Sequence, residues 1–286
     1  MTLLDGKELS AKIKEEVKVE VAALVEAKHI TPGLAVILVG SDAASATYVA
    51  SKAKACKNAG IYSVVHEMPD SITQEELLDT IAMMNKNPKL DGILVQLPLP
   101  KHIDTTVVLE AIDPLKDVDG FHPYNVGRMV SNLDSFLPAT PFGVMRMFDE
   151  YGIELSGKNV VVIGSSDIVG KPMASLLTNA KATVTVCNSR TKDLASHTKA
   201  ADIVVIAVGV PLMLNADMIK DNAVVIDVGI NRLDTGKLVG DADFNDCKDK
   251  CSHITPVPGG VGPMTIAMLL KNTVKAATLR EKRESK

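Results

Sequence analysis

Tyr48 and Lys52 are a pair of residues whose types and spacing could support chemistry. They lie four positions apart in an alanine-rich stretch, 43–59, that predicts a helix, so both side chains share one helix face. The small residues around them leave room for a ligand or for a closely packed helix. A phenol ring beside an amine could hold a small molecule and transfer a proton. An exposed Tyr–Lys pair without a function is the alternative, and it is common at this spacing.

Gln96 is a second candidate because of where its segment places it. Residues 93–95 are apolar and predict a short buried strand, and Gln96 follows at its carboxyl end, before Pro98 and Pro100 prevent further ladder pairing. In open α/β sheets, ligands bind outside the carboxyl ends of strands. A side-chain amide at that edge could contact a small molecule. A Gln96 bonded only to its own loop is equally compatible with this segment.

The segment 164–170 joins a predicted strand to a predicted helix and could bind a phosphate through its backbone amides. It departs from Gly-x-Gly-x-x-Gly at the middle glycine. The next predicted strand ends with Ser189 and Arg190, where an NAD site usually has an acid, and this favours the 2′-phosphate of NADP.

Short-chain dehydrogenases also carry Tyr-x-x-x-Lys, but their glycine loop precedes that pair, whereas here it follows.

The run 256–265 holds three glycines between prolines, directly before a predicted helix. Glycine lets backbone approach a flat ligand without obstruction by a side chain. A simple turn between domains is the alternative interpretation.

Helical and strand patterns alternate along the chain, which predicts an α/β fold with parallel sheets. Thr73 and Glu76 form a capping box, Asp104 caps a further helix, and Thr140 caps one that has Pro141 at its first position. Between 113 and 138 the periodicity disappears, as in a functional or interdomain segment. The pattern around 231–238 predicts a small hairpin. The other expected helices cover residues 5–28, 43–59, 73–87, 171–180 and 264–280, and the expected strands cover 34–39, 61–67, 93–95, 160–163, 183–187, 203–208 and 224–228.

Composition excludes several classes of protein. The chain has 286 residues and a net charge of −4, so we expect no nucleic-acid partner. No apolar run approaches the ~20 residues of a membrane span, and the first thirty residues lack a signal-peptide core. The four cysteines lack the spacing of a zinc site and are expected to be free thiols in a reducing compartment. We expect a cytoplasmic protein with no membrane partner and no metal.

Taken together, five segments closely resemble one family over essentially the whole chain: 48–52, 91–100, 117–128, 140–141 and 256–265. It is the bifunctional methylenetetrahydrofolate dehydrogenase/methenyltetrahydrofolate cyclohydrolase family. The resemblance implies two α/β domains flanking a cleft, in a homodimer. Residues 1–139 with the helix 264–286 would form the folate-binding catalytic domain. Residues 140–263 would form a Rossmann-like, doubly wound parallel sheet that binds NADP.

The resemblance also implies roles for individual residues. Lys52 would be the central catalytic residue, with Tyr48 packing on the folate, Gln96 bonded to Lys52 and Asp119 binding the amino group of the pterin. Many members have arginine where this chain has Ser165, and Arg190 would compensate. The other implied folate contacts are Val95, Leu97, Pro258, Gly259, Gly260, Val261 and Gly262, and the implied cofactor contacts are Gly164, Ser165, Ser166, Ser189, Arg190 and Ile230.

The implied activity belongs to one-carbon metabolism: oxidation of methylenetetrahydrofolate to the methenyl compound with NADP, then hydrolysis to 10-formyltetrahydrofolate. A dehydrogenase that prefers NAD and hydrolyses weakly is an alternative motivated by Ser165. A folate-binding protein without turnover is a second alternative, and the presence of Tyr48, Lys52, Gln96 and Asp119 speaks against it.

Overall fold

The computed structural model describes residues 1–284; Ser285 and Lys286, the last residues of the helix expected over 264–286, lie outside the described residues. The chain divides into two compact units. Unit 1 comprises Met1–Ala11, Met129–Leu133 and Thr140–Thr265, and unit 2 comprises Lys12–Arg128, Asp134–Ala139 and the segment from Ile266 onward. Within the described chain, no helix combines the length and apolar character needed to cross a membrane.

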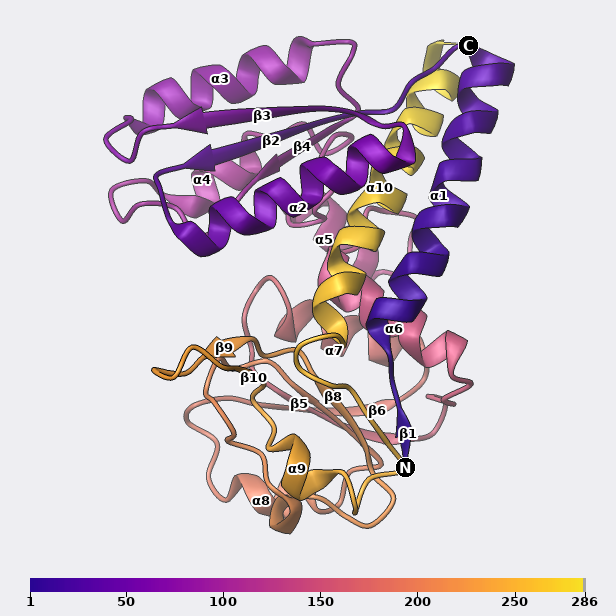
Figure 1. The fold of residues 1–286 in the computed structure, drawn as a ribbon, viewed down its shortest axis with the longest axis vertical. Helices are drawn as coiled ribbons and strands as arrows, with labels where there is room; N and C mark the ends of the chain where they lie inside the picture. Colours follow the sequence, from indigo (N-terminus) through magenta and orange to yellow (C-terminus); the bar gives the residue numbers. More distant parts are fainter. Residues whose placement is uncertain (285–286) are drawn as a thin grey trace. The chain divides into compact units, whose positions relative to one another are not determined.

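Unit 2 is built on a parallel sheet of three strands in the order β3-β2-β4. The central strand β2 (Gly33–Val39) is buried along its whole length, since it pairs with β3 (Tyr62–Met68) on one side and β4 (Gly92–Val95) on the other. Helices α2 (Ala43–Ala59) and α3 (Gln74–Lys86) cover opposite faces of this sheet (Figure 1). The expected capping box of α3 is present, and Asp104 caps α4 (Thr105–Glu110).

Unit 1 is built on a six-stranded parallel sheet in the order β1-β11-β8-β7-β5-β6. Strand β5 pairs with β6 on one side and β7 on the other, so the strand order reverses at β5, as in a doubly wound fold. The expected α/β class with a Rossmann-like parallel sheet is therefore confirmed. The strands are β1 (Thr2–Leu3), β5 (Asn159–Ile163), β6 (Thr183–Cys187), β7 (Ile203–Ile206), β8 (Val224–Asp227) and β11 (His253–Ile254).

Two long helices contribute residues to both units. Helix α1 (Gly6–Lys28) and helix α10 (Val261–Glu284) run side by side in unit 2 (Figure 1), where the Lys271 ammonium lies 2.5 Å from the Glu20 carboxylate. The units consequently do not coincide with the expected domains, because Met1–Ala11 groups with 140–265 and not with the rest of 1–139. The assignment of folate and NADP to separate domains stays a prediction.

The segment 113–138 contains a helix that its sequence pattern did not predict. Helix α5 (Pro123–Val130) begins with proline, whose missing N–H costs nothing at a first helical position. The backbone N–H of Tyr124 donates to His122 Nδ1 at 3.0 Å, which stabilises the start of this helix. Helix α6 (Ala139–Glu150) begins one residue before its expected cap, and the Thr140 hydroxyl hydrogen-bonds to Thr265 Oγ1 at 2.9 Å.

Most other elements agree with the expectations to within a few residues. The expected hairpin is present as β9 (Asn231–Arg232) and β10 (Leu238–Val239), and α7 (Gly170–Asn179) follows β5. The remaining short elements carried too few residues for a periodic signal. They are α8 (Leu194–Thr198), the 3-10 turn Ala216–Met218, α9 (Phe244–Cys247) and the strands β1 and β11.

Candidate active site

Lys52 is a buried residue at the centre of a polar cluster in unit 2. Helix α2 is capped at its start by Asp42, which accepts a hydrogen bond from the Ser45 N–H at 2.7 Å, and the residues Ser45, Val49, Lys52, Cys56 and Ala59 form its buried face. Lys52 lies on that face and is only 4 % exposed. Its ammonium donates to Gln96 Oε1 at 3.0 Å and lies 4.8 Å from the centre of the Tyr48 ring. Helical spacing thus brings Tyr48 and Lys52 together, as expected.

Gln96 is held in place by the sheet and by its own loop. Its backbone N–H donates to Ile37 O at 2.8 Å, which extends the β2–β4 pairing by one residue. Its side-chain Nε2 donates to Leu97 O at 2.7 Å, so the other amide atom, Oε1, faces Lys52. The carboxyl end of β4 therefore presents an oriented acceptor, with Val95 buried behind it.

Lys52 and Asp119 perturb each other's protonation. Burial lowers the pKa of Lys52, and the charges of Asp119 and, more weakly, Cys56 oppose that effect. Burial raises the pKa of Asp119 to about 6, against the attraction of Lys52 and with a further contribution from the Asp117 charge. An amine and a carboxyl group with pKa values displaced toward neutrality are typical of sites that transfer protons.

Asp119 lies in a tight turn. The other residues of this turn were not predicted to be functional from the sequence. Asp117 is 1 % exposed and accepts hydrogen bonds from the backbone of Gly120, Phe121 and His122 and from Asn125 Nδ2. The loss of periodicity over 113–138 indicated a functional or interdomain segment, but the partners of each carboxylate depend on the folded loop.

In unit 1, three of the residues expected to contact the cofactor, Gly164, Ser165 and Ser166, lie in the turn between β5 and α7. A Cβ on Gly170 would lie 2.1 Å from Gly164 O, so only glycine allows α7 to begin this close to the strand end. The Ser166 hydroxyl accepts from the N–H groups of Val169 and Gly170, and Ser165 is half-buried beside it. This tight turn at the start of a helix fits a pyrophosphate group.

The end of β6 carries no acid. Ser189 and Arg190 are both exposed and lie in a turn, where the Arg190 backbone N–H donates to Asn188 Oδ1 at 2.9 Å. An exposed cation and a hydroxyl at this strand end fit a 2′-phosphate. Ile230, after β8, is 57 % exposed, and its Cδ1 lies 3.1 Å from where a Cβ on Gly262 would be.

The glycine–proline run also belongs to unit 1. The Lys7 N–H donates to Gly259 O at 2.9 Å, and a Cβ on Gly6 would lie 1.8 Å from Gly260 O, so this run packs tightly against the start of α1. Val261 is buried and opens α10. Contact of Pro258–Gly262 with folate stays a prediction.

Unit 1 holds a pair of buried carboxylates, Asp227 and Asp241, that the sequence did not predict. Asp241 is fully buried and accepts from the N–H groups of Val208 and Gly209 and from Asn231 Nδ2. Asp227, at the end of β8, accepts from the Asp241 N–H at 3.0 Å, and burial raises its pKa to about 6. These carboxylates tie together the loops that follow β7 and β8.

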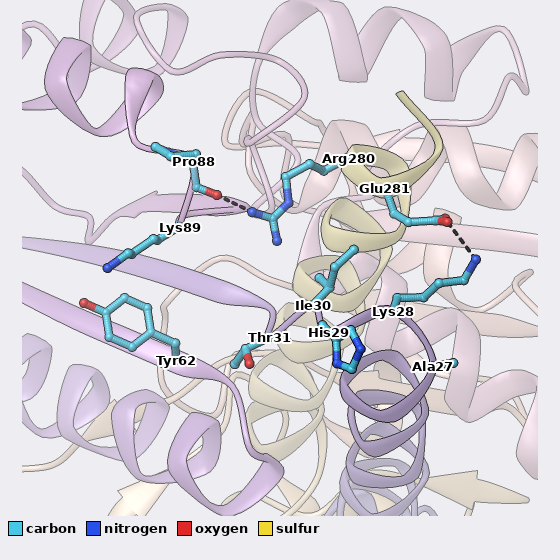
Figure 2. A pocket seen from close by; sticks show the side chains of 10 residues that line it. All are labelled: Ala27, Lys28, His29, Ile30, Thr31, Tyr62, Pro88, Lys89, Arg280 and Glu281. Carbon is cyan, nitrogen blue, oxygen red and sulfur yellow. Dashed lines mark hydrogen bonds and ion pairs between the residues drawn. The ribbon is translucent and has the colours of Figure 1, made fainter. Parts of the chain in front are cut away.

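A cavity of about 970 Å³ lies at the amino ends of the unit 2 strands, opposite to the end where Gln96 lies (Figure 2). It borders Tyr62 at the start of β3 and Lys89 ahead of β4, whereas Gln96 follows the end of β4. Two of its cations are engaged, because Lys28 lies 3.0 Å from the Glu281 carboxylate and Arg280 pairs with Asp91. None of the expected site residues lines this cavity.

Two domain models of one family match the chain. The catalytic domain of tetrahydrofolate dehydrogenase/cyclohydrolase matches residues 4–119, and its NAD(P)-binding domain matches residues 138–281. The chain belongs to the tetrahydrofolate dehydrogenase/cyclohydrolase family. The family resemblance of the five sequence segments is thereby confirmed.

Individual relatives are similar to this chain over nearly the whole length of both proteins. The bifunctional protein FolD of Aliarcobacter butzleri is 85 % identical over 286 residues, which is 100 % of both chains. The crystal structure of bifunctional FolD from Campylobacter jejuni is 56 % identical, with a TM-score of 0.96 over 98 % of this chain and 99 % of that one. The Trypanosoma brucei enzyme, solved with NADP cofactor and an inhibitor, is 40 % identical, with a TM-score of 0.94 over 100 % and 99 % of the two chains.

Proposed function

We propose that this chain oxidises 5,10-methylenetetrahydrofolate to 5,10-methenyltetrahydrofolate with NADP and hydrolyses the product to 10-formyltetrahydrofolate. The observation that carries this proposal is the buried Lys52, bonded to Gln96, stacked on Tyr48 and coupled to Asp119, in a chain of this family. A protein that only bound folate would not need a buried amine with a lowered pKa.

In the oxidation, the residues of this chain bind the folate and the cofactor and align them for hydride transfer. The ring of Tyr48 packs on the folate, Asp119 binds the amino group of the pterin, and Gln96 keeps Lys52 in place. The turn 164–170 and Arg190 would hold NADP, which supplies the acceptor for the hydride from the bridging methylene group. Alignment of donor and acceptor is the main requirement of such a step.

In the hydrolysis, a water molecule attacks the methenyl carbon and gives one proton to Lys52. The bond from that carbon to one of its two nitrogens then breaks, Lys52 returns its proton to the released nitrogen, and the remaining hydroxyl proton leaves to solvent as the formyl carbonyl forms. The cationic methenyl group and the burial of Lys52 both disfavour the ammonium form, so a neutral amine is accessible. General acid–base catalysis of this kind typically contributes ~10²–10⁴-fold.

NADP is proposed over NAD because β6 ends in Ser189 and Arg190 without an acid, and because the Trypanosoma brucei relative was solved with NADP. A preference for NAD with weak hydrolysis is the competing proposal, and Ser165 motivates it. Initial rates with methylenetetrahydrofolate and either cofactor decide between them. Faster turnover with NADP at equal concentration supports the proposal, and equal use of both cofactors contradicts it.

We further propose a cytoplasmic homodimer that assembles through unit 1. The β9–β10 hairpin and the family resemblance support this interface. Sedimentation at micromolar protein concentration should give twice the 30.4 kDa of one chain. A species of 30.4 kDa would contradict the dimer.

A further inference from the structure

The two peptide groups that flank Asp119 are both held by buried side chains. Val118 O accepts a hydrogen bond from Asn272 Nδ2 at 2.8 Å, and the Gly120 N–H donates to Asp117 Oδ1 at 3.1 Å. Peptide groups are planar, so the orientations of these two determine the φ and ψ angles of Asp119. The direction in which the Asp119 carboxylate leaves the backbone is therefore set by Asn272 and Asp117.

Asn272 is far from this turn in the sequence but fixed beside it in unit 2. It lies on α10 and is 2 % exposed, and its Nδ2 also donates to Leu137 O at 2.9 Å. The Asp119 turn also packs closely against Leu137, since a Cβ on Gly120 would lie 2.6 Å from the Leu137 carbonyl carbon. One side-chain amide thus joins the Asp119 turn to the chain that leads into α6.

Asn272 carries no charge, and this separates its effect from that of Asp117. The Asp117 charge contributes directly to the raised pKa of Asp119, so any substitution of Asp117 changes both geometry and electrostatics. Substitution of Asn272 alters the geometry of the turn and leaves every charge near Lys52 in place. Asn272 is consequently the residue on which a positioning role can be tested.

We propose that Asn272 is a positioning residue that sets the Asp119 carboxylate for substrate binding. The inference rests on the function proposed above, in which Asp119 binds the pterin. Misplacement of a binding group by about 1 Å can cost ~10²-fold. Loss of the Asn272 amide should therefore raise the KM for the folate substrate by about 10- to 100-fold in both reactions, with the KM for NADP unchanged.

A double-mutant cycle tests the proposal. Asn272→Leu keeps the branching and the number of heavy atoms of the side chain and removes both donated hydrogen bonds. Asp119→Asn removes the group on which Asn272 would act. Folate KM and kcat are measured for the parent, both single variants and the double variant. The control is Asn85→Leu, because Asn85 also bridges loop backbone in unit 2, to Ala111 O and the Asp113 N–H. If Asn272→Leu does not fold, Asn272→Ser takes its place in the cycle.

The expected result is a raised folate KM in Asn272→Leu, a parental KM in Asn85→Leu, and no further rise when Asn272→Leu is added to Asp119→Asn. An equal rise in the parental and Asp119→Asn backgrounds, or a parental KM in Asn272→Leu, overturns the inference alone. A parental KM in Asp119→Asn overturns the substrate role of Asp119 and the inference with it.

Discussion

The hydrogen bond between Lys52 and Gln96 should control the protonation of Lys52. Gln96 Oε1 accepts from the buried Lys52 ammonium at 3.0 Å, in a partly buried contact. A hydrogen bond to a charged group is worth about 1.5–3 kcal/mol and one between neutral groups about 0.5–1.5 kcal/mol. The difference of about 1–1.5 kcal/mol favours the ammonium form and corresponds to a factor of about ten in the protonation equilibrium.

Two substitutions of Gln96 should therefore displace the pKa of Lys52 in opposite directions. Gln96→Leu removes the acceptor, destabilises the ammonium and lowers the pKa. Gln96→Glu places a carboxylate beside the ammonium and raises the pKa. Because the neutral amine accepts the proton from water, the acid limb of the hydrolysis profile should move to lower pH in Gln96→Leu and to higher pH in Gln96→Glu.

The assay is the pH dependence of methenyltetrahydrofolate hydrolysis, corrected for the spontaneous reaction, together with an NMR titration of the Lys52 side chain. Gln74→Leu is the matched control, because Gln74 Oε1 accepts the Asp104 N–H at 2.8 Å in the same unit. An acid limb that stays in place, or that moves in the same direction in both Gln96 variants, would refute the reasoning.

Three further predictions concern other residues. The raised pKa of Asp119, about 6, means that the folded state binds a proton more tightly than the unfolded state. The contribution of Asp119 to stability should thus fall as pH rises from about 4 to about 6. In urea unfolding, Asp119→Asn should gain about 1–3 kcal/mol over the parent across that window, and no gain would contradict the assignment. Arg190→Ala should lower kcat/KM with NADP at least about tenfold and hardly change it with NAD; equal losses with both cofactors would remove the 2′-phosphate role. Asp241→Ala leaves three donors without their acceptor and should lower the free energy of unfolding by about 3 kcal/mol or more, and a loss below about 1 kcal/mol would show that the β7 loop holds without it.

The elements that the sequence predicted well are those defined by local pattern. The bounds of α2 agree at both ends, because the cap Asp42 and the left-handed Gly60 at its end are local signals. The Tyr48–Lys52 pair follows from the same helix. The position of Gln96 could be predicted because a buried strand ends directly before it and prolines follow it in the chain.

The parts that the sequence could not predict depend on contacts between distant segments. Asn272 reaches a carbonyl 154 residues away, and nothing near it in the chain indicates that partner. Asp241 is likewise buried by loops that follow other strands. Helix α5 was not predicted because it is short and lies in a segment without helical periodicity. Thr140 looked like a cap, but its hydroxyl pairs with Thr265.

The most direct test of the central claim is hydrolysis of methenyltetrahydrofolate by Lys52→Met. Methionine keeps most of the apolar stem of lysine and removes the amine that would accept the proton. Lys54→Met, two positions along α2 at an exposed site, is the control for the loss of a lysine from this helix. After correction for the spontaneous reaction in buffer, we expect no hydrolysis by Lys52→Met, parental hydrolysis by Lys54→Met, and accumulation of the methenyl compound wherever Lys52→Met retains dehydrogenase activity. Hydrolysis by Lys52→Met at the parental rate would show that Lys52 does not transfer the proton and would contradict the mechanism.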